Sequence, residues 1–161
     1  MGIVLNIDQG PERSVWAVPI PQLRDVWEQV RPGLIAVQKK THPTWIPEEV
    51  FMVLAQDRAW LLMGYYQGEY AGFTIVSYER DQFTNTNVPM VWIAYTVREL
   101  PGMLEFVLGH VEQFVRERGY SQIIMHSPRP GWRKLGPKLG FHLRDCVYAK
   151  DLSAPQGEVK R

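Results

Sequence analysis

Residues 88–150 read VPMVWIAYTVRELPGMLEFVLGHVEQFVRERGYSQIIMHSPRPGWRKLGPKLGFHLRDCVYAK. The stretch opens on an apolar run, Val88 to Thr96, which is typical of a buried strand. Apolar residues at helical spacing then predict an amphipathic helix from Leu104 to Arg118, and Gln122 to His126 predicts a second strand. Strand, loop, helix and strand in this order direct the free N–H groups of a helix start toward an anion. The order therefore suggests a negatively charged ligand.

The end of this stretch predicts two more elements. A short basic helix is expected from Trp132 to Leu139, and a last strand is expected to follow Gly140-Phe141 and continue through Val147. Cys146 lies on that expected strand, without an adjacent partner base other than His142. We therefore interpret Cys146 as a buried structural residue rather than a nucleophile.

The first part of the chain predicts one strand and two helical regions. Ser14 to Val18 alternates as a strand does, and prolines end it. Apolar residues recur near helical spacing from Gln22 to Val37, but Pro32-Gly33 interrupts them, which predicts two helical pieces or one broken helix. Pro47, followed by two glutamates, opens a further helix, since proline suits the first turn and carboxylates favour the positive end of the helix dipole.

The middle of the chain predicts three consecutive strands. Trp60 to Tyr66 and Tyr70 to Tyr78 are separated by Gln67-Gly68, which is a good hairpin signal. With the strand at 88–96 they are expected to form an antiparallel meander. The whole order predicts an α/β fold with a mixed, mostly antiparallel sheet and helices on both faces.

Length and composition limit the class of protein. The chain has 161 residues, 45% apolar and 22% charged, so we expect a single domain over residues 1–152 and a frayed polar tail over 153–161. The formal net charge of +1 gives no bulk field that favours nucleic acid or an acidic membrane. One cysteine fits a reducing compartment, and we see no secretion signal or apolar run long enough for a membrane span, so a soluble cytoplasmic protein is expected.

The chain resembles the GNAT superfamily of N-acetyltransferases. The resemblance rests on element order over nearly the whole chain and on motifs in roughly its last 60 residues. In that family the fourth strand separates from the fifth, the pantetheine arm of acetyl-CoA lies in the gap, and the pyrophosphate lies on a loop of the pattern Arg/Gln-x-x-Gly-x-Gly/Ala. The matching residues are Arg98-Glu99-Leu100-Pro101-Gly102-Met103. Ile93 and the pair Phe106-Val107 fall on apolar positions of the flanking strand and helix.

Several positions depart from the family pattern. Pro101 and Met103 replace the two glycines of the loop, which removes one N–H donor and is expected to add bulk where the pyrophosphate lies. The lost donor is expected to weaken binding by about 1 to 3 kcal/mol. Gly136 occupies the position of a tyrosine that protonates the leaving thiolate in active members. Ser127-Pro128-Arg129 stands where an asparagine is expected after the fifth strand.

The resemblance implies acetyl-CoA as co-substrate and a set of residues that hold it. These cofactor-binding residues are Ile93, Ala94, Tyr95, Arg98, Gly102, Met103, Leu104, Ser127 and Arg133. The expected strand at 88–96 carries no carboxylate, so Tyr95 and His126 are the candidate proton acceptors. A strand-end histidine satisfied by backbone or water is the alternative for His126. No histidine has ligand spacing with Asp, Glu or Cys, so no metal site is expected.

Three functions remain open from the sequence. The first is direct transfer of an acetyl group from acetyl-CoA to a small-molecule or protein amine. The second is a catalytically weak or inactive scaffold that binds a protein or small ligand. The third is a nucleic-acid-binding module that uses Arg129, Arg133, Lys134 and Lys138 around the last helix; a solvated helix face explains these charges at least as well.

Aromatic residues are numerous, with six tryptophans and seven tyrosines. Trp45, Trp60, Tyr65 and Tyr66 fall in the region that lines the acceptor side in the family, so one or two of them are expected at an acceptor or partner surface. The apolar and aromatic content also makes a homodimer reasonable.

Overall fold

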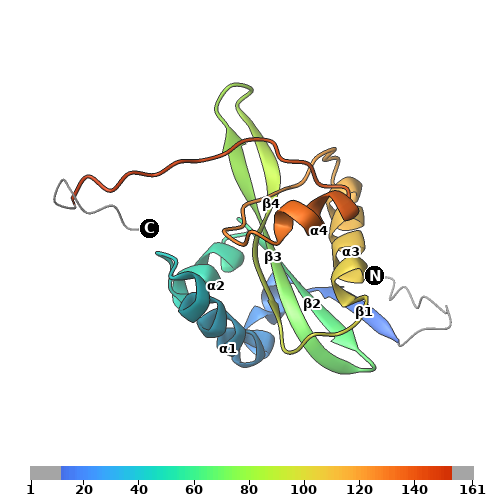
Figure 1. The fold of residues 1–161 in the computed structure, drawn as a ribbon. Coiled ribbons are helices and arrows are strands. Elements are labelled where there is room, and N and C mark those ends of the chain that lie inside the picture. The colour runs from blue at the N-terminus through green and yellow to red at the C-terminus, as the bar shows by residue number, and fades with distance from the viewer. Residues whose placement is uncertain (1–11, 154–161) are drawn as a thin grey trace. The chain divides into compact units, whose positions relative to one another are not determined.

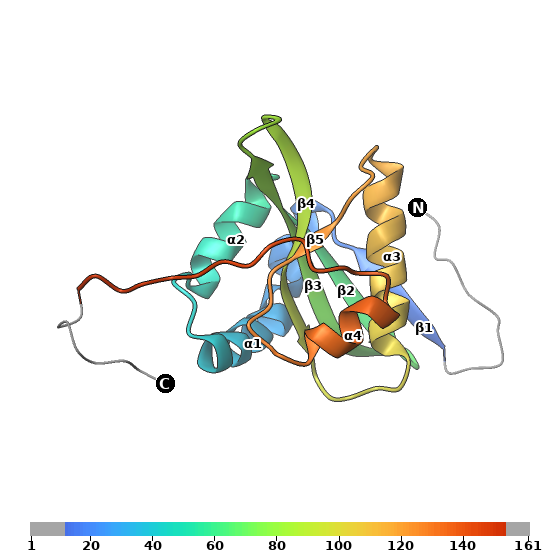
Figure 2. The ribbon, with the colours of Figure 1, turned by 45° about the horizontal axis from the view of Figure 1, so that its top comes forward.

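The computed structural model describes residues 12–153, in two compact units divided between His126 and Ser127. The first unit contains a five-stranded sheet in the order β1-β2-β3-β4-β5 (Figures 1 and 2). Its strands are β1 (Arg13–Ala17), β2 (Trp60–Tyr66), β3 (Glu69–Asp81), β4 (Thr86–Thr96) and β5 (Ile124–Met125). Neighbours run antiparallel, except that β4 and β5 are parallel. The predicted mixed sheet and its antiparallel meander are confirmed.

Helices cover both faces of this sheet (Figures 1 and 2). A 3-10 turn, η1 (Ile20–Gln22), leads into α1 (Leu23–Thr41), which with α2 (Pro47–Ala55) covers one face, while α3 (Met103–Glu117) covers the other. Each face has its own apolar cluster. Fully buried members of the first are Val30, Leu34, Val50, Met63 and Ile75, and those of the second are Val76 and Val111. Each such side chain contributes roughly 1.5 to 3 kcal/mol by leaving water.

Helix α1 runs through Pro32 without a break, so the prediction of two pieces or a broken helix is wrong. Pro32 has no N–H to donate to the Glu28 carbonyl. Both residues are exposed, so water can bond that carbonyl instead. Val30 and Leu34, on either side, are fully buried. Their burial holds the two halves in one line. Gly33 lets α1 pack closely against β4, because a Cβ at this position would lie 2.5 Å from the Tyr95 ring.

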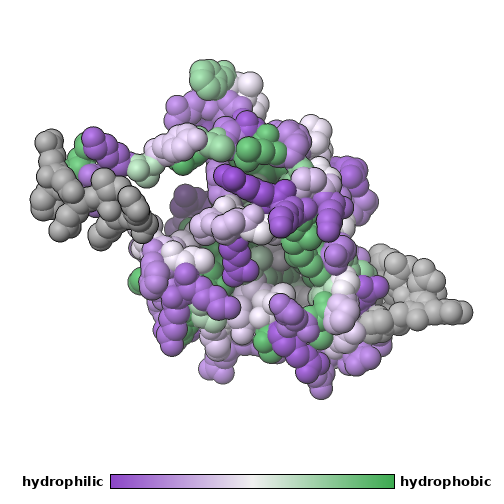
Figure 3. Space-filling view, in the orientation of Figure 1, coloured by the Kyte–Doolittle hydropathy of each residue, from purple (hydrophilic) through white to green (hydrophobic). Residues whose placement is uncertain are grey.

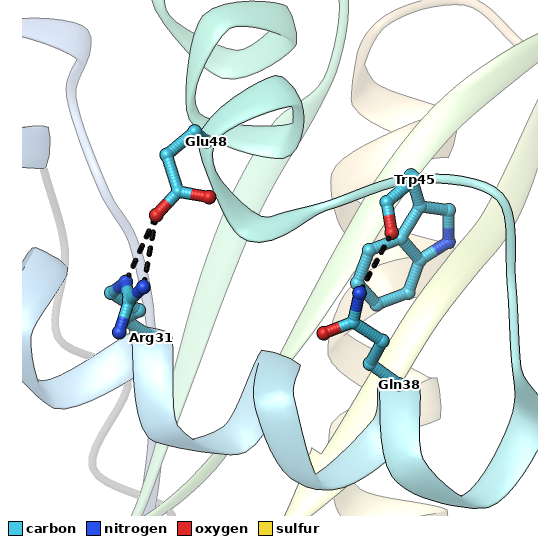
Figure 4. A network of polar contacts seen from close by, with 4 residues as sticks. All are labelled: Arg31, Gln38, Trp45 and Glu48. Atoms are coloured by element: carbon cyan, nitrogen blue, oxygen red, sulfur yellow. Dashed lines mark hydrogen bonds and ion pairs between the residues drawn. The ribbon is translucent and has the colours of Figure 1, made fainter.

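The start of α2 is fixed by side chains that the sequence places there. The Ile46 N–H donates to the Glu49 carboxylate at 3.0 Å, and Pro47 occupies the first turn, as predicted. Arg31 on α1 donates to the Glu48 carboxylate at 3.0 Å (Figure 4). A backbone hydrogen bond, and then Arg31, hold the pKa of Glu48 below its ordinary value.

The β2–β3 turn also follows the sequence signal. Gln67 and Gly68 have φ values of 52° and 76°, which is the conformation that a two-residue hairpin requires. The predicted hairpin is confirmed. The strand expected at 122–126 is present but shorter, at Ile124–Met125.

The second unit contains the predicted basic helix, α4 (Trp132–Lys138). The last strand expected through Val147 is absent from the described residues after α4, so that prediction is wrong. A strand needs a neighbour for its backbone hydrogen bonds, and Leu143 and Val147 are 76% and 82% exposed rather than packed. Cys146 on this segment is exposed, so its interpretation as a buried residue is also wrong. The domain boundary at 152 stays a prediction.

The surface is mostly hydrophilic on the face drawn in Figure 3, and apolar side chains occur there in small groups. In the part of the chain that the structure describes, no helix has the length and apolar character needed to cross a membrane.

Candidate functional site

The most unusual feature of the sheet is the short pairing between β4 and β5. Only Met90 and Val91 of β4 face β5, opposite Ile124 and Met125. On its other side, β4 stays paired with β3 as far as Thr96. In the sheet described over residues 12–153, the segment from Trp92 to Thr96 therefore has a strand neighbour on one side only. Its other backbone edge is available to a ligand.

A β-bulge marks the point where the two strands part. Ile75 is opposite Ile93 and Val76 is opposite Val91, so Trp92 is the extra residue in β4. A bulge bends its strand and increases the local twist, and bulges are common next to active sites. The bend occurs directly after the last residue that pairs with β5.

The side chains after the bulge divide between core and surface. Ile93 is 3% exposed and belongs to the core on the α1 face, so only its backbone is open to a ligand. Ala94 is exposed. Tyr95 is half-buried on the α1 face, where its ring centroid lies 5.8 Å from that of Phe73.

Tyr70 on β3 has phenolic neighbours on two other strands, Tyr65 on β2 and Tyr95 on β4. The hydroxyl of Tyr70 on β3 is buried and has no hydrogen-bond partner within the described residues. Burial, and then the nearby phenols of Tyr95 and Tyr65, raise the pKa of Tyr70 well above its ordinary value. Tyr70 therefore stays protonated and presents an unused donor near Tyr95.

His126 has a partner that the sequence did not indicate. Its Nε2 lies 2.6 Å from Oε2 of Glu79 on β3, and the two side chains are 55% and 45% exposed. The alternative of a strand-end histidine held by backbone or water is replaced by a side-chain contact with the Glu79 carboxylate. Across residues 12–153, no hydrogen bond or ring contact joins His126 to Tyr95.

The loop after β4 ends at the N-terminus of α3. Gly102 has a φ of 71° and precedes the helix, a conformation that suits glycine. The Met103 N–H donates to the Leu100 carbonyl at 3.2 Å. Among the described residues, no backbone carbonyl accepts from the N–H groups of Leu104 and Glu105. These two N–H groups are therefore free to bond an anion.

Met103 points away from this loop. It is 3% exposed, and a Cβ on Gly64 of β2 would lie 2.9 Å from the Met103 Cε. The expectation that Met103 adds bulk over the pyrophosphate position is therefore wrong, because the absence of a side chain on Gly64 leaves room for it in the core. Arg98 is exposed in the loop, and Leu104 is 38% exposed on the first turn of α3.

Arg13 on β1 also reaches this loop, although nothing in the local sequence indicates it. Its Nη1 donates to the Gly102 carbonyl at 3.0 Å, across 89 positions of sequence. Because β1 to β4 are antiparallel to their neighbours, the start of β1 and the end of β4 lie at the same end of the sheet.

Comparison with known proteins identifies the fold but no close relative. No family model matches the sequence, and no curated protein matches it. Among solved structures, aminoglycoside N-acetyltransferase AAC(6')-Iy in complex with CoA matches with a TM-score of 0.65 and 15% identity, over 92% of this chain and 99% of that one. The chain has the GNAT fold.

Two further structures with the GNAT fold show the same likeness. Ribosomal-protein-alanine N-acetyltransferase from Brucella melitensis biovar Abortus 2308 has a TM-score of 0.62 and 16% identity, over 88% of this chain and 99% of that one. A predicted acetyltransferase with acetyl-CoA from Clostridium acetobutylicum has a TM-score of 0.63 and 14% identity, over 87% and 96%. At these identities the likeness concerns the fold.

The aromatic residues expected near an acceptor lie on opposite faces of this GNAT-fold sheet. Trp45 lies in the α1–α2 loop, where its carbonyl accepts from Gln38 at 3.3 Å (Figure 4) and its ring lies 6.4 Å from that of Trp92 at the bulge. Tyr65 belongs to the same α1-side cluster. Trp60 instead packs with Phe114 on the α3 side, so it does not share a face with the other two.

The remaining predicted site residues lie in the second unit. Ser127 Oγ accepts from the Arg129 N–H at 3.2 Å, and Arg133 is exposed on α4. Gly136 is buried, with its nearest neighbours on Phe141 and Trp132. Ser127 and Arg133 stay predictions as cofactor-binding residues. Over the described residues, no group of three His, Cys, Asp or Glu side chains could hold a metal ion.

Proposed function

We propose that this protein transfers an acetyl group from acetyl-CoA to an amine, directly and in a ternary complex. The observation that carries the proposal is the unpaired edge of β4 from Trp92 to Thr96, directly before the loop and the start of α3. Backbone donors and acceptors along such an edge suit the amide-containing pantetheine arm. The free N–H groups at the start of α3 suit the pyrophosphate.

The chain's own groups fit this co-substrate, with a reduced set of donors. Under the proposal, the backbone of Ile93, Ala94 and Tyr95 holds the pantetheine arm. Arg98 and the backbone N–H groups of Leu104 and Glu105 hold the pyrophosphate. Pro101 supplies no N–H, and the Met103 N–H is already bonded to Leu100.

Acetyl-CoA supplies the acetyl group as a thioester, and CoA leaves as the thiol. The chain must orient the amine and accept its proton, and the candidate acceptors are Tyr95 and His126. The half-buried ring of Tyr95, between Phe73 and α1, is the more rigidly held of the two. His126 is held by Glu79 instead.

We expect Tyr95→Phe or His126→Ala to lower turnover by about 100-fold or more, the effect of removing a general acid or base. Turnover is measured as thiol release at saturating acetyl-CoA. The test acceptors are an aminoglycoside and a peptide with a free alanine amine, chosen after the names of two structural neighbours, an aminoglycoside N-acetyltransferase and a ribosomal-protein-alanine N-acetyltransferase. Glu79→Gln is the matched control, because it removes the ion pair but keeps the imidazole. Unchanged turnover in both variants would reject the assignment.

A second candidate function is a scaffold that binds a ligand without catalysis. Pro101 and the internal bond of the Met103 N–H favour it, since both reduce the donors available to a pyrophosphate. Glu99 and Glu105 add negative charge next to the same loop. This candidate predicts that the protein does not bind CoA, so a binding measurement separates the two.

A further inference from the structure

The loop before α3 has lost a donor at Pro101, and a cation from a distant strand reaches the same place. Arg13 lies at the start of β1, and its Nη1 donates to the Gly102 carbonyl at 3.0 Å. Gly102 is the residue directly before α3, next to the free N–H groups of the first helical turn. The guanidinium of Arg13 therefore lies beside the first turn of α3, next to the loop expected to hold the pyrophosphate.

One further contact holds the guanidinium in this position, and the absence of a side chain at Gly102 leaves room for it. Its Cζ lies 5.0 Å from the ring centroid of Phe106 on α3, within cation–π range. A Cβ on Gly102 would lie 2.7 Å from the Arg13 Nη1, so the guanidinium depends on glycine at this position. Arg13 is half-buried, which limits the number of conformations its side chain loses when it binds a ligand.

Most of the hydrogen-bonding capacity of Arg13 is unused. A guanidinium has five N–H donors, and in the described structure only the Gly102 carbonyl accepts from Arg13. No carboxylate forms an ion pair with it in residues 12–153. A planar cation with free donors matches phosphate oxygens well, and Arg–phosphate pairs are often bidentate.

We infer that Arg13 binds the diphosphate of CoA and replaces the backbone donor that Pro101 removes. The inference rests on the proposed function, because it requires CoA at this loop. The inference adds a residue from β1 to the predicted cofactor site, whose other residues all follow residue 92. It also explains how a loop with proline in a glycine position could keep its ligand.

The test compares ligands that contain or lack the diphosphate, by calorimetry with the purified full chain. We expect Arg13→Ala to weaken CoA binding about 10- to 100-fold, and dephospho-CoA binding equally, while pantetheine binding is unchanged. Arg13→Lys should restore part of the affinity, because it keeps the charge but not the planar fork. Arg116→Gln is the matched control, an exposed arginine on the last turn of α3, and should leave all three affinities unchanged.

A salt titration separates a phosphate ligand from a residue that only holds the loop. If Arg13 contacts the diphosphate, the CoA affinity of Arg13→Ala falls less steeply with salt than that of the unaltered protein, since one ion pair is missing. An unchanged salt dependence, equal loss of pantetheine binding, or loss for CoA but not dephospho-CoA would overturn the inference. CoA binding that survives both Arg13 substitutions overturns this inference alone. Failure of the unaltered protein to bind CoA overturns the proposed function and this inference with it.

Discussion

Gly72→Ala is expected to lower the free energy of unfolding by roughly 3 kcal/mol or more, from backbone strain and overpacking together. Gly72 has a φ of 149°, and an added Cβ would lie 2.0 Å from the Tyr95 carbonyl oxygen. That oxygen belongs to the backbone of β4, which is paired with β3 at this point. Neither strand can move away without breaking the ladder, so the clash is not relieved by a side-chain rotation.

Urea unfolding followed by tryptophan fluorescence measures this loss. Gly68→Ala is the matched control, because Gly68 also has a positive φ, 76°, but its Cβ would meet nothing within 4 Å. Gly68→Ala should lower the free energy of unfolding by only about 1 to 2 kcal/mol, the cost of placing a residue with a Cβ in the left-handed conformation. Equal losses at the two positions would contradict the close approach of β3 and β4 at Tyr95.

Pro101→Ala is expected to strengthen CoA binding by about 1 to 3 kcal/mol, which is roughly 5- to 150-fold in Kd. Alanine can adopt the φ of proline and restores the backbone N–H that the loop lacks. Few substitutions improve a site, so a gain of this size would be strong evidence that the diphosphate lies on this loop. Isothermal calorimetry with CoA measures the change.

Pro21→Ala provides the control for this gain, since Pro21 is an exposed proline of η1. Its replacement should leave the Kd for CoA unchanged. A Pro101→Ala protein that binds CoA no better than the unaltered chain would show that this backbone position does not face the ligand.

Local signals predicted most of the fold. The Gln67-Gly68 turn and the Pro47 helix start were predictable, because the residues that decide each of them are within four positions of one another. The prediction of a last strand was wrong because it depended on a contact that is not local in the sequence. Its pattern specifies an extended chain, but a strand also needs a partner strand, and residues 140–152 form none. The predicted break at Pro32 was wrong because the burial of Val30 and Leu34 outweighed the loss of one hydrogen bond.

The site was harder to predict than the fold, because its decisive contacts join distant residues. Arg13 and Gly102 are 89 positions apart, and His126 and Glu79 are 47 positions apart. Met103 matched a loop position in the sequence, yet the space above Gly64 takes its side chain into the core. Pattern matching predicted a loop between β4 and α3, which the structure has, but it did not determine which side chains face that loop.

The central claim is that the unpaired edge of β4 and the start of α3 bind acetyl-CoA, and a calorimetric titration with CoA tests it most directly. The account predicts saturable binding of one CoA per chain, accompanied by a rise in melting temperature. A ligand at 100 times its Kd that binds only the folded state adds about 2.7 kcal/mol to the free energy of unfolding. No heat of binding and no rise in melting temperature at millimolar CoA would contradict the claim and leave the non-catalytic scaffold as the better account.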